Sequence, residues 1–195
     1  QVLYPEFKSE ITPDELIKIV PGPDFPTGAT VYNQQEILNV YATGRGRVVT
    51  RAKMDVEEGK TGKVKLIVTE IPYMVNKSTL ISKIADLVKE KRLEGISAIR
   101  DESDRQDKVR IVVELKRDAN PQVVLNQLYK HTSFQVTYGI SLLMLDGIIT
   151  KTLNLKQIIS KYIDYQKEVI IRRTKFDLAK DEKRVHILEG YKIAQ

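Results

Sequence analysis

Basic side chains recur at close spacing between positions 45 and 53, within the segment TGRGRVVTRAK. They are Arg45, Arg47, Arg51 and Lys53. A guanidinium group binds two phosphate oxygens at once, and the glycine between the first two arginines lets a phosphate come close to the backbone. If the segment forms one regular strand, these side chains share a face. The pattern supports two interpretations equally: a surface that binds a nucleic-acid backbone, or a basic strand that faces solvent without a ligand.

Asn76 and Lys77 form a second candidate phosphate site, at the predicted start of a helix. A helix N-terminus presents unpaired backbone N–H groups and the positive end of the helix dipole, to which Lys77 adds a charge. Asn76 is also typical of a residue that only caps the helix. The remaining cations of this helix are interpreted as solvent-facing charges: Lys83, Lys89, Lys91 and Arg92.

Candidates for catalysis or metal binding are weak throughout the sequence. His131 and His186 are isolated, and neither a nucleophile triad nor a phosphate-binding GxxxxGK[ST] motif is present. Three carboxylates lie close together at Asp101, Glu102 and Asp104, but arginines flank them, which favours ion pairs over a metal site. Tyr73 is interpreted as a packing residue at a turn. We therefore expect no catalytic residue, no metal ligand and no cofactor site in this segment.

Composition sets broad limits on the class of protein. The 195 residues are 42% hydrophobic, contain no cysteine and carry a formal charge of +6. A chain of this length can bury a core, and a basic balance suits a polyanionic partner. The sequence shows neither a signal peptide nor an apolar run long enough to cross a membrane. Disulfide scaffolds and cysteine zinc sites are excluded, and we expect a cytoplasmic protein with no membrane contact.

The pattern of elements predicts an α+β fold with helices packed on a largely antiparallel sheet. A capping box at Thr12 begins a helix that reaches about Val20, and a proline-rich connector follows. Asn33 is expected to cap a second short helix that ends at Gly44. The remaining predicted elements are a strand from about 46 to 56, a hairpin turn at 57–62, strands at 63–71, 96–100 and 109–115, helices at 78–92 and 121–129, and a long strand at 134–145.

From Leu155 the sequence predicts one long amphipathic helix. Two series of residues recur every seven positions: Leu155, Tyr162, Val169 and Phe176, and Ile158, Tyr165, Arg172 and Ala179. This spacing is typical of a coiled coil, and about 40 residues would extend roughly 60 Å. Lys183 and His186 are poor coiled-coil residues, so the apolar seam is expected to weaken toward its end. The alternative is a long core helix of one compact domain.

Six ordered segments resemble the A subunits of bacterial type IIA DNA topoisomerases. They are GPDFPTG at 22–28, YATGRGRVVTRA at 41–52, the run from Glu70 to Arg105, VRIVVELKRDAN at 109–120, VVLNQLYKHTSFQ at 123–135 and RRTKFDLAKDEKRVHILEG at 172–190. The wording EGISAIRDESDR resembles the gyrase branch more than the topoisomerase IV branch. The resemblance implies a leader helix and proline-rich connector at 1–28, an α+β tower domain at 29–153 and the proximal helix of a coiled-coil arm at 154–195.

The resemblance also implies what the whole protein does. Such enzymes cleave both DNA strands through a tyrosine, pass a second duplex and reseal the break, with ATP and Mg²⁺ supplied through the B subunit. In the family that tyrosine lies upstream of the segment beginning at Ile11, so this chain is expected to be an inactive piece of an A₂B₂ assembly. Its expected partners are double-stranded DNA, the B subunit, and a second A subunit. A stand-alone nucleic-acid-binding module and a structural coiled-coil adaptor remain as alternatives.

Overall fold

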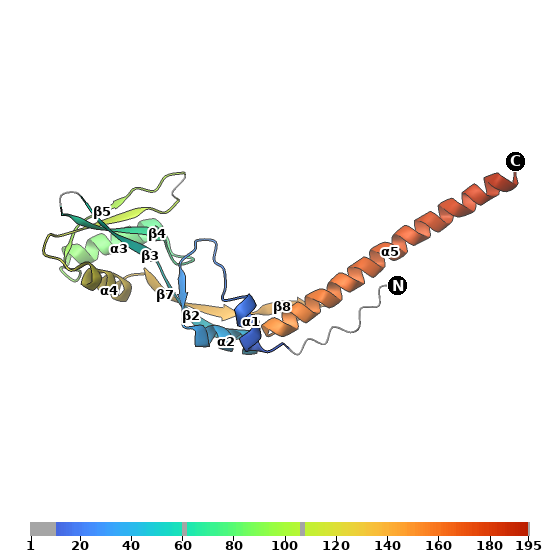
Figure 1. Ribbon diagram of the computed structural model, residues 1–195, viewed down its shortest axis with the longest axis horizontal. Coiled ribbons are helices and arrows are strands. Elements are labelled where there is room, and N and C mark those ends of the chain that lie inside the picture. Colours follow the sequence, from blue (N-terminus) through green and yellow to red (C-terminus); the bar gives the residue numbers. More distant parts are fainter. Residues whose placement is uncertain (1–10, 60–61, 106–107, 195) are drawn as a thin grey trace.

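The computed structural model describes residues 11–59, 62–105 and 108–194. Within these residues the chain forms three antiparallel sheets, helices packed on two of them, and a long C-terminal helix. Figure 1 shows an elongated molecule in which α5 (Leu155–Ile193) projects away from the sheets. The predicted α+β class, with antiparallel sheets followed by a long helix, is confirmed.

A three-stranded sheet occupies the middle of the molecule. It contains β1 (Thr30–Tyr32), β2 (Arg45–Arg51) and β7 (Gln135–Ser141), in the order β1-β2-β7. The helices α1 (Pro13–Ile19) and α2 (Gln34–Thr43) contribute to the apolar cluster on one face of this sheet. Its buried members are Ile17, Ile37, Val40, Tyr41 and Val48. Removing these side chains from water holds the two helices on the sheet and leaves its other face exposed.

A four-stranded sheet carries the larger core, at the end of the molecule away from α5 (Figure 1). Its strands are β3 (Lys53–Glu58), β4 (Val64–Glu70), β5 (Ile96–Asp101) and β6 (Ile111–Leu115), in the order β3-β4-β6-β5. The helices α3 (Lys77–Lys89) and α4 (Pro121–His131) cover one face. Fully buried side chains at the centre include Leu66, Val113, Ile84, Leu128 and Phe134.

Most predicted helix starts are confirmed in atomic detail. Thr12 forms a capping box with Glu15, Asn120 caps α4 ahead of Pro121, and α5 begins with a capping box of its own. Asn33 is the exception. It precedes α2 as predicted, but its φ of 72° is left-handed and its side chain makes no capping hydrogen bond. The helix still ends at Gly44, whose φ of 80° suits glycine.

The strand predicted across residues 46–56 is wrong as a single element. The chain leaves the three-stranded sheet after Arg51 and enters the four-stranded sheet at Lys53. Ala52 makes the transition: it is buried in the larger core, and its backbone N–H donates to the carbonyl of Phe134 at 2.8 Å. Downstream, β3 and β4 pair antiparallel as the predicted hairpin, although residues 60–61 of its turn lie outside the described residues.

The strand predicted from 134 to 145 also divides. β7 ends at Ser141. The Leu142 N–H still donates to the Gly44 carbonyl in the register of β2 and β7, but its carbonyl accepts from Leu153, in the register of the hairpin that follows. The following residues form a separate hairpin of β8 (Leu143–Asp146) and β9 (Ile149–Thr152). The sequence interpretation missed β9 entirely. Gly147, at a φ of 68°, permits the tight turn.

The long helix is confirmed, with 39 residues from Leu155 to Ile193. None of its residues is buried, and Tyr162 and Phe176 of the predicted seam are exposed. The alternative of a core helix inside one compact domain is therefore wrong. Contacts with α2 attach its first turns to the rest of the molecule. No helix in the described part of the chain is long and apolar enough to cross a membrane.

Candidate nucleic-acid interface

The face of the three-stranded sheet that turns away from α1 and α2 carries the predicted arginines. Side chains alternate across a strand, so the burial of Val48 and Thr50 on the helix side places the odd-numbered residues of β2 on the exposed side. Cross-strand partners share a face, which brings Thr30 and Tyr32 from β1 to the same side. β7 contributes its odd-numbered residues: Gln135, Thr137, Gly139 and Ser141. We call this surface the arginine face.

Acidic residues are absent from the arginine face. Its members, all within the described residues, are Thr30, Tyr32, Arg45, Arg47, Val49, Arg51, Gln135, Thr137, Gly139 and Ser141. Neighbours of the cations are hydroxyl, amide, aromatic and glycine residues, none of which neutralises a positive charge. Three cations on one strand, none of them in an ion pair with a described carboxylate, form a surface suited to the evenly spaced phosphates of a nucleic-acid strand.

The arginines differ in how firmly the protein holds them. Arg47 is exposed, and no hydrogen bond or ion pair joins its side chain to another described residue. Arg45 donates from Nη2 to the Thr152 hydroxyl at 3.1 Å. Its remaining N–H groups can still reach a ligand, since a guanidinium has five donors.

Arg51 is held from three sides. Its Nε donates to the Gln135 side-chain oxygen at 2.5 Å, and its Cζ lies 4.5 Å from the ring centre of Tyr32 and 5.1 Å from that of Tyr129. The Tyr129 hydroxyl donates to the Ala52 carbonyl at 2.9 Å, and burial raises the pKa of this phenol. Arg51 therefore stabilises the junction between the two large sheets as well as extending the arginine face. The sequence gives no signal for the two tyrosines and the glutamine, because only the tertiary fold brings them to Arg51.

Lys53 does not belong to the arginine face, contrary to the sequence expectation. It is the first residue of β3, in the four-stranded sheet, and its Nζ lies 3.8 Å from a Glu70 carboxylate oxygen. The other oxygen of Glu70 accepts a hydrogen bond from the Ala29 backbone at 2.6 Å. The physical reason is the exit of the chain at Ala52, which ends the alternation that began at Arg45.

Asn76 and Lys77 lie at the start of α3 and are not part of the three-stranded sheet. Each side chain binds another residue of the protein. The Asn76 side-chain oxygen accepts from the Thr79 backbone at 3.0 Å and so caps the helix. Lys77 forms an ion pair with Asp101 at 2.9 Å. Hydrogen bonds from Ser103, together with Lys77, lower the pKa of Asp101. The capping role left open by the sequence is present, while phosphate binding at this pair stays a prediction.

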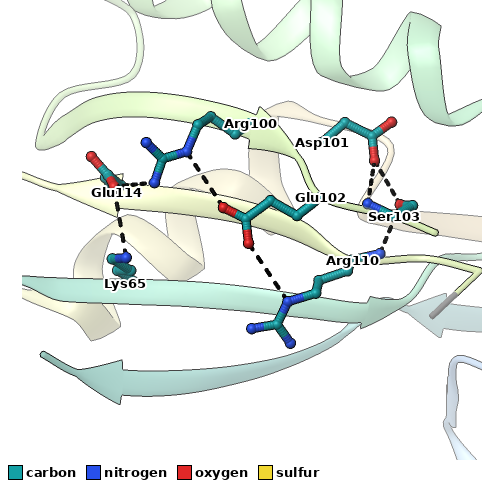
Figure 2. Close-up of polar contacts among 7 residues, drawn as sticks. All are labelled: Lys65, Arg100, Asp101, Glu102, Ser103, Arg110 and Glu114. Atoms are coloured by element: carbon teal, nitrogen blue, oxygen red, sulfur yellow. Dashed lines mark hydrogen bonds and ion pairs between the residues drawn. The ribbon is translucent and has the colours of Figure 1, made fainter. Parts of the chain in front are cut away.

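The four-stranded sheet also has a charged face, which turns away from α3 and α4. Figure 2 shows alternating signs across it: Glu114 lies between Lys65 and Arg100, and Glu102 lies between Arg100 and Arg110. The closest pair joins Arg100 and Glu114 at 2.5 Å. We call this network the ion-pair ladder. Its two carboxylates form ion pairs with arginine and lysine side chains. Among the described residues, no group of three or more acidic or histidine side chains could hold a metal ion.

Tyr73 packs as the sequence indicated. Its ring centre lies 5.7 Å from that of Phe25 and 6.0 Å from that of Tyr138, which also meet each other at 5.1 Å. The three rings join the proline-rich connector, the turn before α3 and β7. This contact uses the Tyr73 ring as an apolar surface, in line with its predicted packing role.

Comparison with known proteins agrees with this architecture. A family model for the A subunit of DNA gyrase/topoisomerase IV matches residues 5–195. The DNA gyrase A subunit of Clostridium acetobutylicum is 54% identical over 185 residues, which are 95% of this chain and 22% of that protein. The corresponding subunits of Streptococcus pneumoniae serotype 4 and Leptospira biflexa are 50% and 48% identical over the same shares. The chain thus spans about a fifth of the length of these curated relatives, and it belongs to the family of DNA gyrase/topoisomerase IV A subunits.

Proposed function

We propose that this chain supports and binds a bent DNA segment within a gyrase-type A subunit. The observation that carries the proposal is the arginine face, where Arg45, Arg47 and Arg51 lie on one strand without a carboxylate beside them. Such a surface binds phosphates without reading bases, which suits an enzyme that acts at many sequences. Contacts to DNA outside a bend offset part of the free energy that bending costs.

The long helix supports a second part of the same proposal. α5 exposes apolar side chains along its length, including Tyr162, Phe176 and Leu188. At 1.5 Å per residue it extends about 60 Å from the sheets. A helix of this kind needs a partner along its seam, so we infer that it forms the proximal part of a coiled-coil arm. In the assembled enzyme the arm links the DNA-binding region to a dimer contact made by a second A subunit.

Family membership also supports a proposal about the activity of the whole protein. The named relatives are DNA gyrase A subunits, so we infer an ATP-dependent DNA topoisomerase in the cytoplasm, assembled as A₂B₂ with ATP and Mg²⁺ bound through the B subunit. The described residues contribute DNA binding and mechanical linkage to this reaction. Strand cleavage would come from parts of the assembly outside the segment at 11–194.

Duplex binding across a salt series tests the proposal. Replacing Arg45, Arg47 and Arg51 with glutamine should weaken binding and flatten the slope of log affinity against log salt by about 0.9 for each lost phosphate contact. The control replaces Lys83, Lys89 and Lys91 with glutamine, which removes the same charge from the helix region interpreted as solvent-facing. Equal weakening by both triple variants would show that net charge alone matters, and the arginine face would then have no special role.

A structural coiled-coil adaptor remains as the second candidate, favoured by the exposed seam of α5. An adaptor would bind a helical partner and would show no affinity for duplex DNA even at low salt. The unmodified chain in the same titration therefore distinguishes the two functions.

A further inference from the structure

Two glycines lie inside the strands of the three-stranded sheet, and the fold explains only one of them. Gly46 of β2 faces α2, where an added Cβ would lie 2.5 Å from Cγ2 of Val40. A side chain at position 46 would force the Val40 side chain out of its place between α2 and the sheet. The packing of α2 on the sheet therefore accounts for glycine at position 46.

Gly139 of β7 has no such requirement. An added Cβ would meet no atom within 4 Å, and its φ lies outside the left-handed region that favours glycine. Glycine inside a strand is unfavourable, and it often marks a place where a ligand or another backbone comes close to the sheet. The described structure offers ample room for a larger residue here, so local folding gives no reason for the glycine.

The position of Gly139 suggests what the missing side chain permits. It lies directly opposite Arg47, at the centre of the arginine face. Its neighbours on this face of β7, Thr137 and Ser141, are small hydroxyl residues. Arg47 is also the arginine whose side chain no described residue holds. The surface is therefore lowest next to its least restrained cation.

We propose that Gly139 forms a gap in the arginine face that lets one phosphodiester of a DNA backbone reach Arg47 at the level of the sheet. The inference rests on the proposed function and identifies where the DNA backbone comes closest to the sheet. A phosphate seated in the gap can accept two hydrogen bonds from the Arg47 guanidinium, while a side chain at position 139 would hold the DNA backbone further from the strand. Gly139 acts here as a positioning residue.

Gly139→Val tests the gap in the 195-residue chain with a short duplex as the probe. Valine favours strands and its Cβ meets no atom within 4 Å at this position, so the melting temperature should stay the same or rise. Duplex affinity should fall, and the salt slope should flatten by about 0.9, as it should for Arg47→Gln. Gly190→Val in α5 is the matched control, because an added Cβ there also meets nothing within 4 Å. It should bind DNA as the unmodified chain does.

The outcomes separate the gap from the proposed function. Normal binding by Gly139→Val, with weakened binding by Arg47→Gln, would overturn the gap and leave the arginine face in place. Normal binding by both variants would show that Arg47 makes no phosphate contact, which also overturns the gap. Only normal binding by the triple variant of Arg45, Arg47 and Arg51 would contradict the proposed function itself. A lower melting temperature for Gly139→Val would show that the glycine serves the fold, and that result would also overturn the inference.

Discussion

The two large sheets have similar architecture but different surface electrostatics: one exposed face carries unpaired cations, and the other carries cations paired with carboxylates. Each is antiparallel, and each packs a pair of helices on one face and presents charged residues on the other. The arginine face carries three cations and no carboxylate, whereas every cation of the ion-pair ladder meets Glu102 or Glu114. A cation count alone would rank the two surfaces as equal. Strand register places carboxylates beside the cations of the ion-pair ladder and so neutralises that surface. The arginine face has no such carboxylates and can attract a polyanion.

Exposed ion pairs of this kind add little stability, typically 0 to about 1 kcal/mol each. Their larger effect is on the local potential, because a paired arginine has less capacity to replace the counterions of DNA. The difference between the sheets should therefore appear in binding experiments more than in unfolding experiments. Substitutions that add carboxylates to the arginine face, or remove them from the ion-pair ladder, test whether unpaired positive charge decides which sheet binds DNA.

The largest expected effect comes from making the arginine face resemble the ion-pair ladder. Thr137→Glu combined with Ser141→Glu adds carboxylates to β7, the second of them directly opposite Arg45. Cross-strand pairs of opposite charge should preserve or slightly raise stability. Duplex affinity should fall sharply, with a salt slope lower by about 1.8 if two phosphate contacts are lost. Fluorescence anisotropy at several salt concentrations measures both quantities.

The control for this change uses the other sheet. Thr69→Glu combined with Ser97→Glu alters the same residue types and the same net charge in β4 and β5. It should reduce affinity much less than the β7 pair. Equal losses from the two double variants would mean that DNA responds to total charge, and the contrast between the sheets would have no functional meaning.

The reverse change should confer binding on the ion-pair ladder. Glu102→Gln combined with Glu114→Gln leaves Lys65, Arg100 and Arg110 without their carboxylates. Cations released in this way become available to phosphates, so duplex affinity should rise and the salt slope should steepen by up to about 0.9 per new contact. An unchanged slope would indicate that shape, in addition to charge, keeps DNA from this surface.

A smaller effect is expected on stability from Tyr129→Phe. The substitution keeps the ring beside Arg51 and removes the hydrogen bond to the Ala52 carbonyl, so the free energy of unfolding should fall by about 1 kcal/mol. Urea denaturation measures this loss. The salt slope for DNA binding should not change, because Arg51 keeps its charge and its contact with Gln135. A flatter slope would reveal that the tyrosine hydroxyl itself takes part in DNA binding.

The smallest effect concerns the acid dependence of the Lys77–Asp101 pair. The pKa of Asp101 lies below its ordinary value of 3.8 in the folded protein, first because Ser103 donates to it. A lowered pKa contributes stability above pH 3.8, and that contribution disappears as the pH falls through the folded value. Asp101→Asn should therefore lower stability at neutral pH by less than about 1 kcal/mol. Thermal melts should show this difference shrinking well below pH 3.8; a constant difference would assign it to a cause other than titration.

Local sequence signals predicted the helices more accurately than the strands. Thr12, Asn120 and Asn154 each begin a helix through a side-chain hydrogen bond within three residues, so the cause and the effect are both local. The divisions at Ala52 and Leu142 have no local cause of this kind. Each residue keeps one hydrogen bond in the register of the three-stranded sheet, to Phe134 and to Gly44, and the next residues pair with different strands that are chosen by the tertiary fold. Hydrophobic alternation continues through both positions and gives no indication that the chain changes sheets.

The candidate site could be predicted from the sequence only in part. The spacing of Arg45, Arg47 and Arg51 indicated a shared face, and the structure places them on one. The prediction that Lys53 shares this face is wrong, because the alternation stops one residue earlier, at Ala52. The absence of carboxylates around the arginines and the gap at Gly139 depend on which strand pairs with β2, and that pairing joins segments about 90 residues apart. Sequence spacing alone therefore indicates the cations but not their surroundings.

Photo-cross-linking to duplex DNA tests the contrast between the sheets most directly. Thr137 and Thr69 are both exposed threonines on the helix-free face of a sheet, one on the arginine face and one on the side of the ion-pair ladder. A photoreactive side chain placed at position 137 should cross-link to DNA at low salt, and the same group at position 69 should not. Equal cross-linking at both positions, or cross-linking at position 69 alone, would contradict the assignment of DNA binding to the arginine face.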